Sequence, residues 1–249
     1  MSSAGRALIV ADAHLGSRPG DVEAFLSFLE RHGARAQRLV FLGDLFDLWL
    51  GFDRLQSDAQ RRVLGALRGL RARGARLYYV EGNRDYFLAE FLSPDPFESV
   101  AGEGLDLDLG GALLRFEHGD RINRDDRNYQ LWRRLSRSSP VRRAFKALPA
   151  GAATALSRWL ERRMRTTNAA HRARLPEALC RERALEAFRA GAQRLFLGHF
   201  HRPWLWETSV DGKACRAQVV PAWLDTGAGW VYDPGAGLDA LTSALAPGS

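Results

Sequence analysis

The sequence predicts an α/β fold in which a largely parallel β-sheet is covered by helices, with antiparallel strands added late in the chain. Two observations support this: short apolar runs alternate with helical patterns, and several of the runs end abruptly in a polar residue. The composition, with 46% hydrophobic and 26% charged residues over 249 positions, is typical of a globular protein with a substantial core. A chain of this length can form one large domain or two small ones.

The first half of the chain alternates strands and helices. Uninterrupted apolar runs predict buried strands, and apolar residues at helical spacing predict helices. In the first helix Val22, Phe25 and Leu29 share one face, Asp21 is expected to cap the helix and Gly33 to end it. The elements expected in this half are strands at 7–12, 38–44 and 76–83 and helices at 21–33 and about 56–73.

The second half continues with two strands, and the alternation resumes after a long segment of different character, residues 121–175. The tail from about Asp233 is rich in Gly, Ala and Pro, and we expect it to be loose. The elements expected here are strands at 104–109, 112–117, 194–199, 204–210 and 214–220 and a helix at about 177–190.

Positive charge is concentrated in residues 121–175. The chain has a formal net charge of +7, and this segment contains fifteen Lys or Arg and three acidic residues, which leaves −5 for the rest of the chain. Leu, Trp, Phe and Ala are interspersed with the arginines, and Pro140, Pro149 and Gly151 divide the segment. We expect two or three short amphipathic helices, inserted between strands.

The sequence predicts a cytoplasmic protein. Cys180 and Cys215 lie far apart and outside any metal-ligand spacing, so we expect two reduced thiols. The N-terminal apolar run is too short for a signal peptide, and no stretch reaches the length of a membrane span.

Residues of metal-ligand type follow five of the predicted strands. In open α/β sheets ligands bind beyond the carboxyl ends of the strands, so we expect these side chains to meet there. His199 and His201 are one residue apart, which would place both imidazoles on the same side of an extended backbone. The residues concerned are Asp12, His14, Asp44, Asn83, His118, His199 and His201.

Seven ligands exceed what one ion with an open position needs, and they suit two divalent ions about 3.5–4 Å apart that share a carboxylate. Ligation by nitrogen and oxygen without thiolate favours Mn²⁺, Fe²⁺ or Zn²⁺ over Ca²⁺. The carboxylates of Asp12 and Asp44 offset only part of the charge of two such ions, so an anionic substrate is expected. This balance indicates hydrolysis of a phosphoester.

In this order the motifs resemble the calcineurin-like metallophosphoesterases, and the chain is most similar to the UDP-2,3-diacylglucosamine hydrolases of lipid A biosynthesis over about residues 1–231. The resemblance implies a single domain over residues 1–249, a sandwich of mixed β-sheets flanked by helices, with residues 121–175 inserted as a helical lid. The motifs are D-x-H (12–14), GDLFDLWLG (43–51), GNRD (82–85), HGD (118–120), DDRNYQLWR (125–133), ALP (147–149), RMRTTN (163–168) and GHxH (198–201).

The resemblance implies dimetal-dependent hydrolysis of the pyrophosphate bond of UDP-2,3-diacylglucosamine to UMP and 2,3-diacylglucosamine 1-phosphate. Mn²⁺ is the expected metal, with Fe²⁺ or Zn²⁺ as alternatives. One ion would be held by Asp12, His14, Asp44 and His201. The other would be held by Asp44 (bridging), Asn83, His118 and His199. The implied catalytic residues are Asp44, Asn83, Arg84 and His118, and the implied substrate-binding residues are Asn83, Arg84, Asp126, Tyr129, Arg165, Asn168 and His199.

Some positions depart from the family pattern. Arg84 stands where many superfamily members have a histidine; arginine cannot act as an acid at neutral pH, but it can grip phosphate oxygens. Asn168 replaces a serine. The family's substrate-binding lysine is missing, and Arg172 and Arg174 are the candidates to replace it.

The resemblance also implies that the lid holds the lipid part of a nucleotide-lipid substrate. Its arginines would meet an anionic membrane surface, so that the protein associates peripherally with the cytoplasmic face of the inner membrane. Neither a nucleic acid nor an obligate protein partner is expected. If the lid is separable, deletion of residues 122–174 should spare the hydrolysis of small phosphodiesters.

Several alternatives stay open. The same dimetal site could act on another phosphomonoester or phosphodiester, such as a nucleotide or a phosphoprotein. The basic segment could instead be a nucleic-acid-binding surface. Arg84 could simply pair with Asp85 or Glu81, while Asp47, Asp85 and Asp120 are interpreted as residues that orient the histidines.

Overall fold

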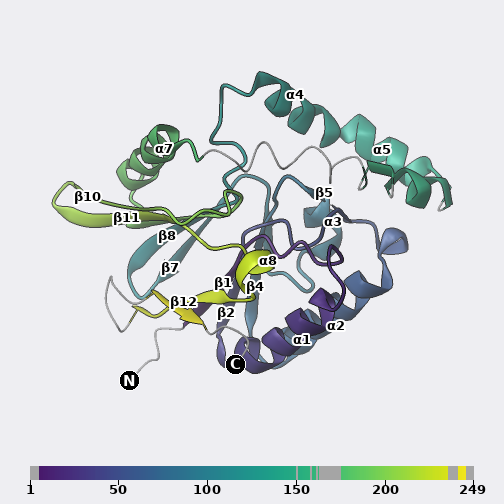
Figure 1. Cartoon of the computed structure of the whole chain (residues 1–249), viewed down its shortest axis with the longest axis horizontal. Coiled ribbons are helices and arrows are strands. Elements are labelled where there is room, and N and C mark those ends of the chain that lie inside the picture. The colour runs from purple at the N-terminus through teal and green to yellow at the C-terminus, as the bar shows by residue number, and fades with distance from the viewer. Residues whose placement is uncertain are drawn as a thin grey trace.

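The computed structural model describes residues 6–149, 151–157, 159–160, 162, 175–234 and 241–244. Its strands form two main sheets that face one another, with helices on the outer faces (Figure 1). The predicted sandwich of mixed sheets flanked by helices is confirmed. Within the described residues, no helix is both long and apolar enough to cross a membrane.

The first sheet has six strands in the order β13-β12-β1-β2-β4-β6. Strands β1, β2, β4 and β6 are parallel, and β12 and β13 extend the sheet as antiparallel strands. The expectation of a loose tail is wrong for residues 241–244, because they pair with β12. The strands are β1 (Ala7–Val10), β2 (Arg38–Phe41), β4 (Arg76–Val80), β6 (Ser99–Ala101), β12 (Gly229–Tyr232) and β13 (Leu241–Ala244).

The second sheet has five strands in the order β10-β11-β9-β8-β7. Its three central strands, β8, β9 and β11, are parallel, and each edge strand is antiparallel to its neighbour. The antiparallel strands expected late in the chain are confirmed by β10 and β12, but the single sheet suggested by strand–helix alternation is two sheets. The strands are β7 (Leu105–Leu109), β8 (Ala112–Glu117), β9 (Arg194–Leu197), β10 (Leu205–Val210) and β11 (Lys213–Val219).

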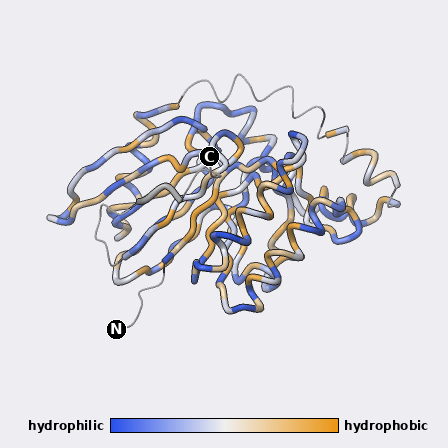
Figure 2. Tube along the Cα trace, turned by 60° about the horizontal axis from the view of Figure 1, so that its bottom comes forward, coloured by the Kyte–Doolittle hydropathy of each residue, from blue (hydrophilic) through white to orange (hydrophobic). Residues whose placement is uncertain are grey.

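Three apolar layers hold this arrangement together, and Figure 2 shows the most hydrophobic stretches of the trace in the central strands. Between the sheets, residues such as Ile9 and Val40 of the first sheet are buried with Phe116 and Phe196 of the second. A second layer lies between the first sheet and its helices, and a third lies between the second sheet and α7 (Glu177–Arg189). Burial of apolar surface in these layers is the main favourable term in folding.

The helices on the first sheet are α1 (Asp21–His32) and α2 (Asp58–Ala72). Helix α2 begins with a capping box between Ser57 and Gln60, close to the start expected at about residue 56. Asp21 does not cap α1. Its carboxylate instead accepts hydrogen bonds from the backbone N–H groups of Gly16 and Arg18, so it stabilises the turn before the helix.

The segment between β8 and β9 contains α4 (Arg127–Ser136) and α5 (Ser139–Ala147), and residues 151–157 are also helical. These helices lie over a small two-stranded sheet, β3 (Trp49–Leu50) with β5 (Asp85–Tyr86), and over α3 (Leu88–Leu92) (Figure 1). Phe145 is buried there against Phe52 and Tyr86. The remaining elements are η1 (Gly33–Arg35), η2 (Asp53–Leu55) and α8 (Trp223–Thr226).

Candidate metal centre

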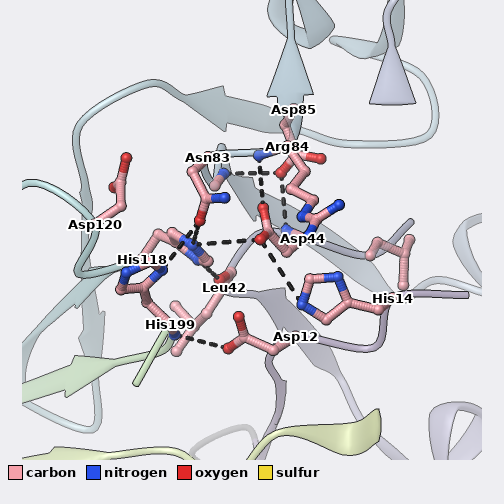
Figure 3. Close-up of polar contacts among 12 residues, drawn as sticks. Asp12, His14, Leu42, Asp44, Asn83, Arg84, Asp85, His118, Asp120 and His199 are labelled. Carbon is pink, nitrogen blue, oxygen red and sulfur yellow. Dashed lines mark hydrogen bonds and ion pairs between the residues drawn. The ribbon is translucent and has the colours of Figure 1, made fainter. Parts of the chain in front are cut away.

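The carboxyl ends of five strands converge at one edge of the sandwich. Three of them, β1, β2 and β4, are neighbours in the first sheet, and β8 and β9 are neighbours in the second. The loops that follow these strands bring together all seven predicted ligands: Asp12, His14, Asp44, Asn83, His118, His199 and His201. Figure 3 labels all of these except His201.

The ligand atoms fall into two groups. Asp12, His14 and His201 each offer an atom within 4.8 Å of the others, and so do Asp12, Asp44 and His118. Asp44 Oδ2 lies 3.8 Å from both His14 Nε2 and His118 Nε2, and therefore between the groups. These distances are too long for hydrogen bonds. They are close to the separation of about 3–3.5 Å expected for two donors on one small divalent cation.

Asn83 completes the second group. Its Oδ1 lies 3.0 Å from both His118 Nε2 and His199 Nδ1. The rings of these two histidines lie 5.1 Å apart. Asn83 Oδ1 therefore lies close to a nitrogen of each imidazole, as expected if the three residues bind the same metal ion.

The backbone at the site has an unusual conformation. Left-handed φ angles are uncommon for residues other than glycine. Among the described residues, the non-glycine positions with such angles include five of the seven predicted ligands. These are Asp12, His14, Asp44, His199 and His201. Strain of this kind clusters at functional sites, where the surrounding structure maintains it.

This conformation corrects the argument for the two neighbouring histidines. Strand β9 ends at Leu197, and the φ angles of His199 and His201 are 69° and 52°, so the backbone is not extended. The two imidazoles serve different groups. His201 Nε2 lies 3.6 Å from Asp12 Oδ1, whereas His199 contacts Asn83.

Glycines allow the loops to approach so closely. A Cβ atom on Gly82 would lie 2.3 Å from Asp44 Oδ1, and one on Gly198 would lie 2.9 Å from Asp12 Oδ2. Each glycine directly precedes a ligand, Asn83 or His199. Any larger side chain would therefore push two ligand-bearing loops apart.

The electrostatics of the site suit a cation. Burial raises the pKa of Asp12, but the nearby histidines outweigh this effect and lower the pKa well below its ordinary value. Burial opposes the charged form of His118, yet Asp44 and Asp12 raise its pKa to about 9. Burial and the charge on His118 lower the pKa of His199 to about 4, which keeps this imidazole neutral. Neutral imidazole is the form that binds metals.

Asp12 gives the most direct indication. Its Oδ2 accepts a hydrogen bond from the backbone N–H of His199, but its Oδ1 is buried and has no hydrogen-bond partner. A buried carboxylate oxygen without a partner is costly unless a cation occupies the position it faces. The residues present therefore fit divalent metal ions held by nitrogen and oxygen donors.

Residues around the ligands fix their orientation. His118 donates its Nδ1–H to the carbonyl of Leu42 at 2.7 Å, and His201 donates its Nδ1–H to Asp225 Oδ2 at 2.9 Å. Each bond leaves Nε2 directed at the site, as in many metal centres. Asp47 Oδ1 lies 3.5 Å from His14 Nδ1.

Asp85 and Asp120 do not orient histidines through hydrogen bonds. Asp85 Oδ2 accepts from the backbone N–H groups of Gly82 and Asp44 and from the hydroxyl of Tyr79, so it fixes two ligand loops. Burial and the negative charge of Asp44 raise the pKa of Asp85 to about 7. Asp120 instead accepts hydrogen bonds from two residues of α4, Tyr129 and Arg133.

The predicted substrate-binding residues have different positions. Asp126 and Tyr129 line the same pocket as the metal-ligand residues. Asp126 Oδ1 also caps α4 by accepting from the backbone N–H of Tyr129. Arg165 and Asn168 lie outside the described residues, as do Arg172 and Arg174.

Arg84 is almost fully buried, and it is not among the residues that line this pocket. Its guanidinium donates to the carbonyl of Asp47 at 2.9 Å and lies 3.9 Å from the Asp47 carboxylate. Its backbone N–H donates to Asp44 Oδ1. The guanidinium is therefore paired with Asp47 rather than with the expected alternatives, Asp85 or Glu81.

Three further residues were not singled out from the sequence. Asp225 follows no pattern that would connect it with His201. Arg133 and Arg137 could have been found from helical periodicity, because with Tyr129 they recur every four residues along α4 and its C-terminal cap, and so lie on one side. That side is directed at the metal centre.

No family model matches the chain. Curated relatives do: a UDP-2,3-diacylglucosamine hydrolase from Edwardsiella ictaluri is 31% identical over 218 residues, covering 87% of this chain and 84% of the relative. One from Pseudomonas paraeruginosa is 31% identical over 217 residues, covering 87% and 90%. Among solved structures, an archaeal phosphodiesterase matches at a TM-score of 0.47 with 10% identity, covering 96% of this chain and 99% of that one. The similarity to the curated relatives extends over nearly the whole length of both chains, and the chain therefore belongs to the UDP-2,3-diacylglucosamine hydrolase family.

Proposed function

We propose that this protein hydrolyses the pyrophosphate bond of UDP-2,3-diacylglucosamine and releases UMP and 2,3-diacylglucosamine 1-phosphate, a step of lipid A biosynthesis. The convergence of seven nitrogen and oxygen ligands from two sheets is the observation that carries the proposal. The names of the curated relatives support the choice of substrate.

Two divalent cations, Mn²⁺ in our proposal, would occupy the site. Asp12, His14, Asp44 and His201 would hold one of them, and Asp44, Asn83, His118 and His199 would hold the other. Bound divalent cations lower the pKa of a water molecule and neutralise phosphoryl charge, which is the chemistry that this hydrolysis needs.

The protein's own groups would prepare the site. The Leu42 carbonyl and the Asp225 carboxylate fix the tautomers of His118 and His201, so that each presents Nε2 to the site. Arg84 would contact the phosphates: its backbone N–H, bonded to Asp44 Oδ1, holds it next to that ligand, and its guanidinium would have to leave the carbonyl of Asp47 to reach the substrate. A guanidinium fork matches the geometry of phosphate oxygens.

Residues 121–175 would form a lid inserted in a single metallophosphoesterase domain. Asp126 and Tyr129 would contact the substrate from α4, with Arg165 and Asn168 as further contacts. The described part of the segment exposes large apolar side chains among its arginines: Leu131, Trp132, Leu135 and Trp159. Apolar residues interspersed with arginine suit both acyl chains and an anionic membrane surface, which supports peripheral binding at the inner membrane.

The substrate is tested by incubating the protein with Mn²⁺ and UDP-2,3-diacylglucosamine and by measuring the UMP released. The matched control is UDP-N-acetylglucosamine, which has the same pyrophosphate but no acyl chains. We expect rapid turnover of the lipid and little of the control. Turnover of a generic phosphodiester without UMP release would favour the alternative, a phosphoesterase of the same superfamily acting on a nucleotide or a phosphoprotein.

Membrane association is tested by sedimentation with vesicles of phosphatidylglycerol and phosphatidylcholine. We expect the protein to bind anionic vesicles, and Leu131→Ser combined with Leu135→Ser to weaken this binding. Hydrolysis of a small, water-soluble phosphodiester should stay unchanged in this variant. Equal binding by the variant and the wild type would contradict the assignment of this surface.

A further inference from the structure

Helix α4 lies outside both sheets, yet Arg133 within it and Arg137, the residue at its C-terminal cap, bond to loops around the candidate metal centre. Arg133 donates to Asp120 Oδ2 at 2.8 Å and to the carbonyl of Gly102 at 2.9 Å. Arg137, one helical turn later, donates its Nη2–H groups to the carbonyls of Gly82 at 2.6 Å and Asp85 at 2.9 Å. Its guanidinium also lies 4.6 Å from the centre of the Tyr86 ring.

These contacts surround one ligand. Asn83 lies in the loop between the two carbonyls that Arg137 binds, and its Oδ1 is directed at His118 and His199. On the inner side the loop is fixed by Asp85, whose carboxylate accepts from the N–H of Gly82. On the outer side, among the described residues, the hydrogen bonds that join its carbonyls to the inserted segment come from Arg137.

The chemistry of Arg137 suits this role. A guanidinium is planar and presents several N–H donors in a fixed geometry, so one side chain can hold two carbonyls at a set separation. Stacking on the buried ring of Tyr86 fixes the plane of the group and adds a cation–π interaction. Hydrogen bonds from a charged donor are also about twice as strong as those between neutral groups.

We propose that Arg137 is a positioning residue for Asn83: α4 completes the metal centre by holding the loop of residues 82–85 from outside. This inference rests on the proposed role of Asn83 as a metal ligand. It also changes the expectation for the inserted segment. The segment is then a structural part of the second metal site, and its loss would disable the site even toward substrates that have no lipid.

The test uses Arg137→Gln in the full chain, with Arg134→Gln as a matched control. Arg134 is on the same helix and has the same charge, but it is exposed. Mn²⁺ binding is measured by titration calorimetry and by elemental analysis after dialysis. We expect the control to bind two ions as the wild type does. In Arg137→Gln we expect one site to weaken by about 10–100-fold, the range seen when a residue behind a ligand is lost, while the other keeps its affinity.

A double-mutant cycle with Asn83→Ala shows whether Arg137 acts through Asn83. If it does, the double variant binds metal no more weakly than Asn83→Ala alone, because the residue that Arg137 positions is already gone. Fully additive losses would overturn the proposal. So would unchanged binding in Arg137→Gln, equal weakening of both sites, or the same weakening in the control.

Chemical rescue separates positioning from a general effect on folding. In Arg137→Ala, guanidinium added at about 10–50 mM is expected to restore part of the metal affinity and part of the turnover of bis(p-nitrophenyl) phosphate. The N–H groups of the added ion can occupy the position that the arginine side chain leaves empty. Arg137→Lys should keep part of the affinity without rescue. Absence of rescue in a folded Arg137→Ala variant would contradict the proposal. Because every readout is a metal affinity or a lipid-free reaction, the result is independent of whether UDP-2,3-diacylglucosamine is the substrate.

Discussion

The two halves of the proposed metal centre are supported by different parts of the chain. Asp12, His14 and His201 are held by the loops of the sandwich itself, with Asp225 behind His201. Asn83, His118 and His199 are held partly by a buried backbone carbonyl and partly, through the loop of residues 82–85, by the inserted helix α4. Similar ligands thus depend on local structure in one half and on a distant segment in the other.

The groups that support the two halves also differ in their exposure to solvent. The side chain of Asp225 is 47% exposed, so water and salt weaken its interaction with His201. The hydrogen bond from His118 to the Leu42 carbonyl is buried. A buried polar group that loses its partner incurs the full cost of desolvation. Changes behind the second half should therefore have larger effects than changes behind the first.

The largest effect is expected from Asp44, whose carboxylate lies between the two halves at 3.8 Å from both His14 Nε2 and His118 Nε2. Asp44→Asn removes the charge that the two groups share. We expect kcat/KM for a small phosphodiester to fall by about 10³-fold or more, since metal ions contribute several kcal/mol to such reactions. Asp58→Asn is the control, because that aspartate is on α2 with a side chain 93% exposed. Activity within tenfold of the wild type would show that the halves do not share Asp44.

An intermediate effect is expected behind the first half. Asp225→Asn keeps the size of the side chain but weakens its hold on His201, and we expect Mn²⁺ affinity at one site to fall by about tenfold. The loss should be smaller than that of Arg137→Gln because Asp225 is more exposed. Glu207→Gln is a suitable control, since its partner Arg216 lies on β11. If Asp225→Asn lost more Mn²⁺ affinity than Arg137→Gln, the first half would be the one that depends more on its supporting residue.

The smallest effect is expected on the reactivity of the two cysteine thiols. This measurement distinguishes a variant that has changed only at the metal site from one that has unfolded. Burial raises the pKa of Cys180 to about 12, so this thiol stays protonated at pH 8. Cys215 is also buried, and burial raises its pKa. We expect neither thiol to react with a disulfide reagent at pH 8 in the wild type or in the variants above, and both to react in urea. If the thiols of a variant react rapidly without urea, its loss of metal is explained by unfolding.

Much of the fold and of the candidate site could be predicted because the signals are local. Apolar runs end where strands end, so the polar residues after β1, β2, β4, β8 and β9 could be identified as a converging set. The capping box at Ser57 and Gln60 is likewise contained within four residues. Such patterns depend on hydrogen bonds and side-chain directions between near neighbours, which the sequence specifies directly.

What the tertiary structure decided depends on packing between distant segments. Alternation of strands and helices cannot say that β8 and β9 belong to a second sheet, because that division follows from which apolar faces bury one another. It cannot direct His199 and His201 to different groups either, since their left-handed backbone exists only where surrounding loops maintain it. Arg137 reaches the carbonyl of Gly82 across 55 residues of sequence, and no local pattern specifies a contact of that range.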